Sequence, residues 1–254
     1  ALIEKSSRKY QQRMSEWIDI ALEEGIRFFV TSLGKPDWVA KRVHAVNGLV
    51  YHDVTEMKWA KIGLDNGADG LICVNNRAGG HAGEKSIQQL YDELKRLDAP
   101  LVCAGGVGDS NGFNQALDIG YAACQLGTRF IASEECLASN IYKQAILDAG
   151  EEDIVLSERI TGIPVSVINT DYIKRNGLKS GWLARWMLSG NRTKHWMRTI
   201  YALKSIWQLK KSSLDESGKR DYWQAGKSVA SINSIQTCDS IIQGLVNSQA
   251  SSAL

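Results

Sequence analysis

Three short apolar runs that each end in a glycine-rich turn constrain the fold of this chain most strongly. The first run, residues 70–74, leads into Ala78-Gly79-Gly80-His81-Ala82-Gly83, and the other two end in Gly105-Gly106 and in Gly127-Thr128. Turn-forming residues that stop an apolar run abruptly predict buried β-strands. Glycine lets backbone N–H groups approach a phosphate closely, so the last two turns predict a phosphate cradle.

Helical patterns alternate with strands along the first half of the chain. The expected strands are residues 26–31, 48–54, 70–74, 101–104 and 121–126. The expected helices are residues 1–24, 36–46, 56–66, 86–97 and 111–119, the last of them capped by Asp109-Ser110. Such an alternation predicts an α/β fold with a parallel sheet and helices outside it. Beyond residue 134 the pattern favours helices, at residues 139–149, 182–187, 193–211 and 237–246.

Together these segments resemble the nitronate monooxygenase family, also called 2-nitropropane dioxygenases, which are FMN-dependent TIM-barrel flavoenzymes. Four motifs in the family's order carry the resemblance: Thr31-Ser32-Leu33-Gly34-Lys35-Pro36, Ala78-Gly79-Gly80-His81-Ala82-Gly83, Ala104-Gly105-Gly106-Val107 and Gln125-Leu126-Gly127-Thr128-Arg129-Phe130. Weaker similarity continues through residues 156–164 and 223–227. The resemblance implies a TIM (β/α)8-type barrel.

The position of the first motif suggests that part of this barrel is absent. The family reaches that motif after three strands, whereas here it begins at residue 31 and only five strands are predicted. The chain is therefore expected to lack the first three strand-helix units and to be N-terminally truncated; a rearranged half-barrel that dimerises is the alternative. Two regions are expected, a partial FMN-binding (β/α) barrel at residues 1–135 and a C-terminal helical region packing on it at residues 136–254.

Charge and cysteine usage narrow the class of protein. A net charge of +2 favours neither nucleic acid nor membrane as the main partner, and no apolar run reaches the length of a membrane span. Residues 174–211 carry ten Lys or Arg and no Asp or Glu, among four tryptophans. A solvated helical cap with inward tryptophans explains this segment, and docking of an anionic substrate or carrier domain is the alternative. Five cysteines without a Cys-x-x-Cys pair predict reduced thiols and a cytoplasmic protein.

His81 is the candidate catalytic residue. In TIM barrels the chemistry occupies loops at the carboxyl ends of the strands, and His81 lies in the turn after residues 70–74. An imidazole titrates near neutral pH, so it is suited to removing a proton from the carbon alpha to a nitro group. His44 and His195 lack such a setting, and His52-Asp53 is expected to be a hydrogen-bonded structural pair. The histidines are not spaced as metal ligands, so no metal is expected.

The resemblance assigns FMN binding to the glycine turns and two neighbouring side chains. The cofactor-binding candidates are Gly79, Gly80, Gly105, Gly106, Gln125, Gly127 and Thr128. Gly79 and Gly80 are expected at the edge of the flavin, and the later turns at its phosphate. Arg129 is expected to be either a ligand or a salt-bridge partner of Glu134 or Glu135.

By the same resemblance, the expected function is FMN-dependent oxidation of alkyl nitronates, or of nitroalkanes, by O2 to a carbonyl compound and nitrite. The partners would then be a small-molecule substrate and O2. Two alternatives remain open. One is a flavin-dependent enoyl-acyl-carrier-protein reductase, whose acidic carrier would suit the basic segment. The other is a noncatalytic fragment that persists as a homo-oligomer.

Overall fold

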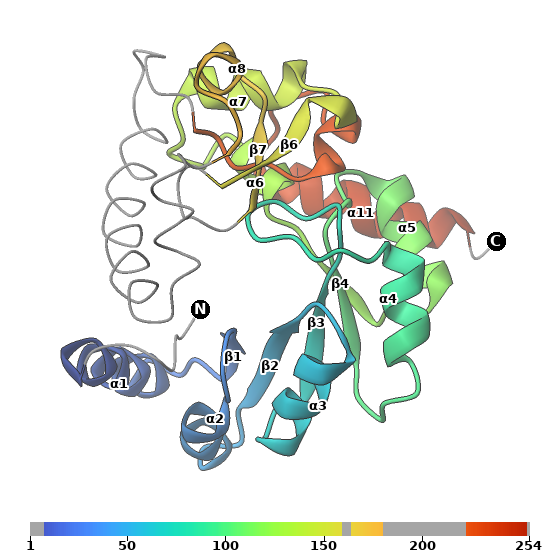
Figure 1. Ribbon diagram of the computed structural model, residues 1–254. Coiled ribbons are helices and arrows are strands. Elements are labelled where there is room, and N and C mark those ends of the chain that lie inside the picture. Colours follow the sequence, from blue (N-terminus) through green and yellow to red (C-terminus); the bar gives the residue numbers. More distant parts are fainter. Residues whose placement is uncertain (1–7, 159–163, 180–221, 253–254) are drawn as a thin grey trace. The chain divides into compact units, whose positions relative to one another are not determined.

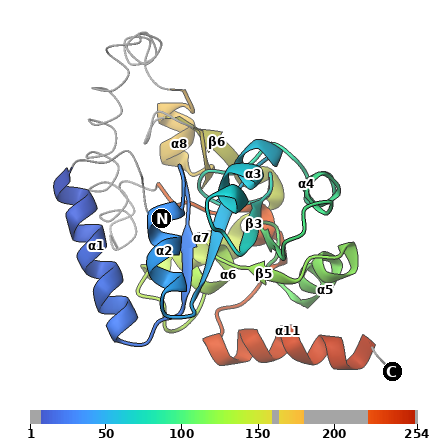
Figure 2. The same cartoon turned by 90° about the horizontal axis from the view of Figure 1, so that it is seen from below.

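The computed structural model describes residues 8–158, 164–179 and 222–252, and Figures 1 and 2 show it in two views. The helices expected at residues 182–187 and 193–211, and His195, lie outside the described residues. Two compact units interleave along the chain. The first comprises Ala1–Asn75, Gly83–Ala104 and Ala116–Gln125, and the second comprises Asn76–Ala82, Gly105–Gln115 and Leu126–Leu254. The domain boundary expected at residue 135 stays a prediction.

The first unit contains a five-stranded parallel sheet whose strands follow the order of the chain (Figure 1). The strands are β1 (Phe28–Thr31), β2 (Leu49–Val54), β3 (Gly70–Val74), β4 (Leu101–Ala104) and β5 (Ala123–Gln125). All five expected strands are confirmed, with bounds that differ by at most two residues. Crossovers between parallel strands are right-handed, so an unbroken strand order places the connecting helices on one face of the sheet.

The helices of this part of the chain match the sequence pattern closely. They are α1 (Arg8–Glu23), α2 (Asp37–His44), α3 (Met57–Asp65), α4 (Ile87–Leu94) and α5 (Ser110–Ile119). At the start of α5, Oδ1 of Asp109 accepts a 2.9 Å hydrogen bond from the amide of Gly112, so the expected cap is confirmed. Ser86 begins α4 with a capping box in which Ser86 and Gln89 exchange hydrogen bonds.

A compact apolar cluster explains why α1 is amphipathic. Ile18 of α1 is buried together with Val39 and Val43 of α2 and Val50 of β2. Ser15 and Asp19 of the same helix pair with Arg42 of α2.

The second unit is built from short helices and one antiparallel hairpin. Its elements are α6 (Thr128–Ile131), α7 (Asn140–Asp148), η1 (Glu151–Asp153), β6 (Ile154–Ser157), β7 (Val165–Ile168), α8 (Asp171–Asn176), η2 (Lys227–Ser231) and α11 (Cys238–Ser252). Helices α7 and α11 were expected, whereas the pairing of β6 with β7 was not. All four residues of β7 are buried, so this strand lacks the alternation of buried and exposed residues by which a strand is recognised in a sequence. The region beyond residue 134 is therefore not purely helical.

One core cluster holds the second unit together. Trp223 stacks on Tyr142 of α7 with ring centroids 5.6 Å apart, and both pack with Ile146, Ile168 and Val229. The amide of Ile168 also donates to the carbonyl of Trp223. The segment that follows Trp223 is thus fixed against α7 and β7.

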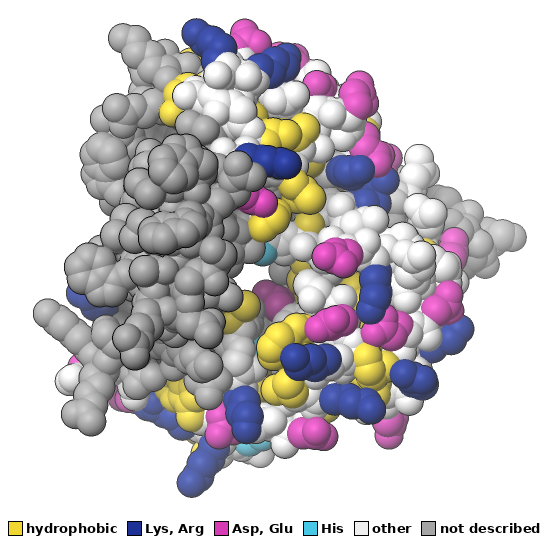
Figure 3. All heavy atoms as spheres, in the orientation of Figure 1, with side chains coloured by type: hydrophobic (Ala, Val, Ile, Leu, Met, Phe, Trp, Pro, Cys, Tyr) yellow, Lys and Arg dark blue, Asp and Glu magenta, His cyan; other side chains and the backbone are white. Residues whose placement is uncertain are grey.

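On the face drawn in Figure 3, basic and acidic side chains of the described residues are interspersed rather than gathered by sign. The chain's near balance of 30 basic and 28 acidic residues agrees with that distribution. Among the described residues, no helix is long and apolar enough to cross a membrane. All five cysteines lie in the described part of the chain and none is in a disulfide.

Candidate functional site

The Gly-Gly-His turn lies directly after β3 and is held by backbone contacts to distant parts of the second unit. Gly80 has a φ of +67°, a left-handed conformation that favours glycine. Its carbonyl accepts a 2.7 Å hydrogen bond from the amide of Ser166 in β7. The two residues form an antiparallel bridge, so the turn is anchored next to the position of His81.

A second clamp comes from the segment that follows Trp223. The carbonyl of Arg77 accepts a 2.9 Å hydrogen bond from the amide of Lys227. A Cβ atom added to Gly79 would lie 2.9 Å from the nitrogen of Gly226, and one added to Gly226 would lie 2.7 Å from the nitrogen of Gly79. Both positions therefore require glycine because the two backbones touch. Sequence reasoning found only a weak family similarity at residues 223–227 and missed that this segment joins the site.

His81 stands at the exposed end of this clamped turn. Although the residue is exposed, the surrounding protein removes enough water from the imidazole to lower its pKa below the usual value. The lowered pKa keeps the ring neutral at pH 7. A neutral imidazole on a rigid turn is able to accept a proton from a carbon acid placed beside it.

The turn after β4 brings a glycine backbone against a cationic side chain. Gly105 and Gly106 have φ values of +116° and +83°. A Cβ atom on Gly106 would lie 2.7 Å from Nε of Arg77, so only glycine fits beside that side chain. The turn thus presents backbone close to a guanidinium group, an arrangement suited to an anion.

The turn after β5 continues into α6 and touches the same clamp. Thr128 is buried, and its hydroxyl oxygen accepts a 2.9 Å hydrogen bond from the amide of Gly226. A Cβ atom on Gly127 would meet nothing within 4 Å. Thr128 therefore supports the Gly79–Gly226 contact, while Gly127 borders open space.

The turns after β4 and β5 follow neighbouring strands of the sheet. Ala104 and Gln125 are register partners in the parallel sheet, so the chain enters both turns from adjacent positions. Within the described residues, the amides of Gly106 and Gly127 donate to no protein acceptor. Open backbone N–H groups next to glycines provide the hydrogen-bond donors that a phosphate needs.

The predicted site residues divide unevenly between the two units. Gly79, Gly80, His81, Gly105, Gly106, Gly127 and Thr128 all belong to the second unit. Gln125 is the exception, because it ends β5 in the first unit, where it is exposed. The structure therefore brings seven of the eight candidates into one compact unit.

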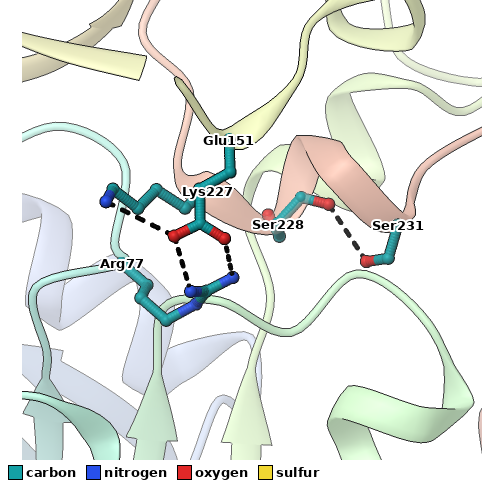
Figure 4. A network of polar contacts seen from close by, with 5 residues as sticks. All are labelled: Arg77, Glu151, Lys227, Ser228 and Ser231. Carbon is teal, nitrogen blue, oxygen red and sulfur yellow. Dashed lines mark hydrogen bonds and ion pairs between the residues drawn. The ribbon is translucent and has the colours of Figure 1, made fainter. Parts of the chain in front are cut away.

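A charged network that sequence reasoning did not predict adjoins the turn after β4 (Figure 4). Glu151 forms a bidentate ion pair with Arg77, with both N–O distances 2.8 Å, and lies 3.4 Å from Nζ of Lys227. Hydrogen bonding from Arg77, and secondarily from Lys227, lowers the pKa of the Glu151 carboxyl. Figure 4 also shows Ser231, whose hydroxyl donates to the carbonyl of Ser228 in the same 3-10 helix.

Arg129 serves a structural purpose that differs from the expected salt bridge. The side chain is buried, and its Nη2 donates to the carbonyl of Ser234 at 2.9 Å and to Oε1 of Gln236 at 3.3 Å. No ion pair joins it to Glu134 or Glu135 within the described residues; the Glu135 carboxylate accepts from the amide of Cys238 instead. Burial lowers the pKa of the guanidinium group.

The other histidines of the described chain have structural partners in the first unit. Nδ1 of His52 lies 2.8 Å from the hydroxyl of Thr31, and Nε2 of His44 lies 2.8 Å from Oδ2 of Asp69. The expected His52–Asp53 pair does not form. Over the described ranges, no three His, Cys, Asp or Glu side chains are grouped as metal ligands.

Comparison with known proteins supports the expected family. The family model described as nitronate monooxygenase matches residues 2–248. A relative from Rhodococcus jostii (strain RHA1), a "(3aS,4S,5R,7aS)-5-hydroxy-7a-methyl-1-oxo-octahydro-1H-indene-4-carboxyl-CoA dehydrogenase", is 26% identical over 90% of this chain and 72% of its own length. A "probable nitronate monooxygenase" from Staphylococcus saprophyticus is 28% identical over 65% of this chain and 50% of its own length. The chain spans about half the length of the Mycobacterium tuberculosis and Staphylococcus relatives that it matches.

Two solved structures share the fold. FabK from Thermotoga maritima has a TM-score of 0.79 at 22% identity and covers 99% of this chain, which in turn covers 75% of FabK. A nitroalkane oxidase from Streptomyces ansochromogenes has a TM-score of 0.76 at 20% identity, with coverage of 98% and 71%. These likenesses confirm the expected α/β fold of TIM-barrel type, of which the parallel sheet is a part.

Proposed function

The chain belongs to the nitronate monooxygenase family of FMN-dependent oxidoreductases, and on that premise we propose that it binds FMN and oxidises alkyl nitronates with O2 to carbonyl compounds and nitrite. The observation that carries the proposal is the Gly-Gly-His turn, whose backbone is held by Gly226 and Ser166 directly before His81, a histidine of lowered pKa. The two turns with open amides supply a matching phosphate site in the same unit.

The candidate residues have different roles in holding the cofactor. The amides of Gly106 and Gly127 would donate to the phosphate, and Arg77, which is ion-paired with Glu151, lies beside Gly106. Gly79 and Gly80 would let the turn approach the flavin closely, and Thr128 would add a side-chain contact; Gln125, which belongs to the first unit, is a further candidate contact. When bound, FMN supplies the electron acceptor for the nitronate and the electron donor for oxygen.

His81 acts on the substrate proton. A neutral nitroalkane must lose the proton on the carbon alpha to its nitro group before it becomes a nitronate. The neutral imidazole of His81 removes that proton and, as an imidazolium, holds the resulting anion. A nitronate added as such has already lost the proton and needs only orientation.

The partners of the proposed reaction are the small-molecule substrate and O2. Five cysteines that all remain thiols favour a cytoplasmic location. A homo-oligomer is proposed as the working state, because β1 and β5 end the described sheet without a further strand partner.

The test compares two substrates in the complete protein with His81→Asn. Asparagine is polar and no larger than histidine, and the turn is held by backbone contacts, so FMN content and fold should be unchanged. Turnover of a neutral nitroalkane should fall roughly 10²- to 10⁴-fold, the usual contribution of a general base. Turnover of the preformed nitronate should fall far less. His44→Asn is the matched control, since His44 contacts Asp69 in the first unit, and it should leave both rates unchanged.

Three outcomes would contradict parts of this proposal. Equal losses on both substrates would assign His81 to orientation or anion binding, and no loss on either would make it structural. A protein that purifies without flavin absorbance and does not take up added FMN would favour the noncatalytic fragment.

A thioester oxidoreductase is the second candidate function. It is favoured by the Rhodococcus relative, which is named as a dehydrogenase of a carboxyl-CoA compound and matches 90% of this chain. The flavin-dependent enoyl-acyl-carrier-protein reductase belongs to the same class of thioester substrates. Rapid reduction of the bound flavin by NADH or NADPH, followed by reoxidation with an enoyl thioester, would select the reductase over the nitronate reaction.

A further inference from the structure

Three cysteines lie side by side across the parallel sheet of the first unit. Cys73 of β3 is the register partner of Cys103 in β4, and Cys103 is the register partner of Cys124 in β5. Register partners on adjacent strands point to the same face of a sheet, so the three thiols form one row. None of the residues proposed to bind FMN or substrate belongs to this row.

The row has one accessible end. Cys73 and Cys103 are fully buried, whereas Cys124 is half-buried on β5, the last strand of the described sheet, between the exposed residues Ala123 and Gln125. A small oxidant therefore reaches Cys124 first. Cys103 is then the only thiol next to it in the row.

Cys103 and Cys124 are directly opposite each other in the register of β4 and β5. The neighbouring Cys103 thiol lowers the pKa of Cys124, whereas the neighbouring Cys124 and burial raise the pKa of Cys103. Burial also raises the pKa of Cys73 to about 12. Because the thiolate is the reactive form, the reactive sulfur of the row is Cys124.

From this geometry we propose that Cys124 and Cys103 form a reversible disulfide in response to a hydroperoxide, across β5 and β4. The Cys124 thiolate attacks hydrogen peroxide, which leaves Cys124 as a sulfenic acid and releases water once a proton is taken up. The Cys103 thiol then attacks that sulfur, the S–O bond breaks, and a second water leaves. Two thiols and one peroxide thus give one disulfide and two waters.

The strand spacing permits this bond. Neighbouring strands lie about 4.8 Å apart, and disulfides join residues whose Cα atoms are about 4.4–6.8 Å apart. The buried partner needs no solvent access of its own, because it reacts only with the sulfenic acid formed beside it. The bond would tie the edge strand β5 to β4 just before the two glycine turns.

The tryptic peptide of residues 97–129 contains both cysteines and no internal Lys or Arg, so the experiment has a direct readout. The reduced full chain is treated with hydrogen peroxide, alkylated, digested and analysed by mass spectrometry. The peptide should lose the mass of two hydrogen atoms and take up no alkyl group, and chymotryptic cleavage after Phe113 should leave its halves joined. Reduction with dithiothreitol before alkylation should restore two alkylation sites.

Variants locate each step. Cys103→Ser should leave Cys124 as a sulfenic acid that dimedone traps, and Cys124→Ser should leave Cys103 reduced. Cys73→Ser is the matched control from the same row and should still form the disulfide. Circular dichroism of each variant verifies the fold.

The native reactivity of the thiols gives a second measurement on the unmodified sequence. In the folded chain, iodoacetamide should label Cys124 roughly tenfold or more faster than Cys73, since each pKa unit changes the thiolate fraction about tenfold. Peroxide treatment that leaves both Cys103 and Cys124 open to alkylation, that links Cys124 to another cysteine, or that requires Cys73 would overturn the proposal. Equal labelling of Cys124 and Cys73 would also overturn it.

Discussion

The amide of Gly226 donates a 2.9 Å hydrogen bond to the hydroxyl oxygen of Thr128, and this bond links α6 to the segment that clamps the Gly-Gly-His turn. Gly226 in turn lies against Gly79, where neither backbone leaves space for a Cβ atom. The turn after β5 and the histidine turn are therefore connected through one glycine. This arrangement makes Thr128 a supporting residue of the turn as well as a candidate cofactor contact.

Thr128→Ala should lower the free energy of unfolding by about 1–3 kcal/mol, because the buried amide of Gly226 loses its acceptor. Thr128→Ser keeps the hydroxyl and should lose much less. Urea unfolding of both variants measures the difference. Equal stabilities of the alanine variant and the unmodified chain would mean that the amide finds water or another acceptor.

A negative charge introduced at position 127 should weaken flavin binding without disturbing the fold. Gly127 has an ordinary φ of −113° and space for a side chain, so Gly127→Asp and Gly127→Asn should both fold. Only the aspartate places a negative charge against the phosphate. Gly127→Asp should therefore purify with little FMN, whereas Gly127→Asn, its uncharged match in size, should retain more.

Flavin absorbance per chain, combined with thermal unfolding, measures that effect. Stoichiometric FMN in the aspartate variant would move the phosphate away from this turn. Gly106 is a poorer place for the same test, because its φ of +83° and its contact with Arg77 would strain any substituted residue.

The sequence indicates the sheet and the histidine turn well because those features are local. The strands β3 and β4 are short apolar runs that end directly before Asn75 and Gly105, and the capping residue Asp109 precedes α5 by one position. The contacts of Gly226 and Ser166 with the turn join residues far apart in the chain, and no local pattern marks them. The pairing of β6 with β7 was missed because both strands have only four residues and β7 is buried throughout, so it carries no alternation. The salt bridge expected for Arg129 is wrong because the acceptors of this side chain are a carbonyl and an amide, which leave no charge signal in the sequence.

Glu151→Gln should remove the bidentate pair with Arg77 and the contact with Lys227. The pair is partly exposed and screened by water, so the loss at neutral pH should be at most about 1 kcal/mol and smaller at high salt. The folded chain lowers the pKa of Glu151, so the stabilisation is present above the ordinary value of 4.5 and disappears as the pH falls through the lowered pKa. The two chains should have equal stability once the pH is below that lowered pKa.

Thermal unfolding as a function of pH tests this expectation. Glu152→Gln is the matched control, since the neighbouring carboxylate has no ion pair among the described residues. A Glu152→Gln loss as large as that of Glu151→Gln would assign the effect to net charge rather than to the pair.

Asp53→Asn should make the first unit more stable at neutral pH. Oδ1 of Asp53 is buried without a hydrogen-bond partner in the described chain, and burial raises the pKa of this carboxyl from 3.8 to about 6. The unfolded chain thus loses this proton at a lower pH than the folded chain. The Asp53 carboxyl therefore lowers the free energy of unfolding progressively as the pH rises from about 4 to about 6. The cost above pH 6 is at most about 3 kcal/mol, and asparagine removes it.

Urea unfolding at several pH values should show equal stability of the two chains near pH 4 and a growing advantage of Asp53→Asn up to pH 7. Asp69→Asn is the opposite case, because the Asp69 carboxylate accepts hydrogen bonds from the amide of Val50 and lies 2.8 Å from Nε2 of His44. That substitution should destabilise at neutral pH. If Asp53→Asn also destabilised the chain at every pH, the carboxylate would have a stabilising partner in the folded state, and its raised pKa would not persist in solution.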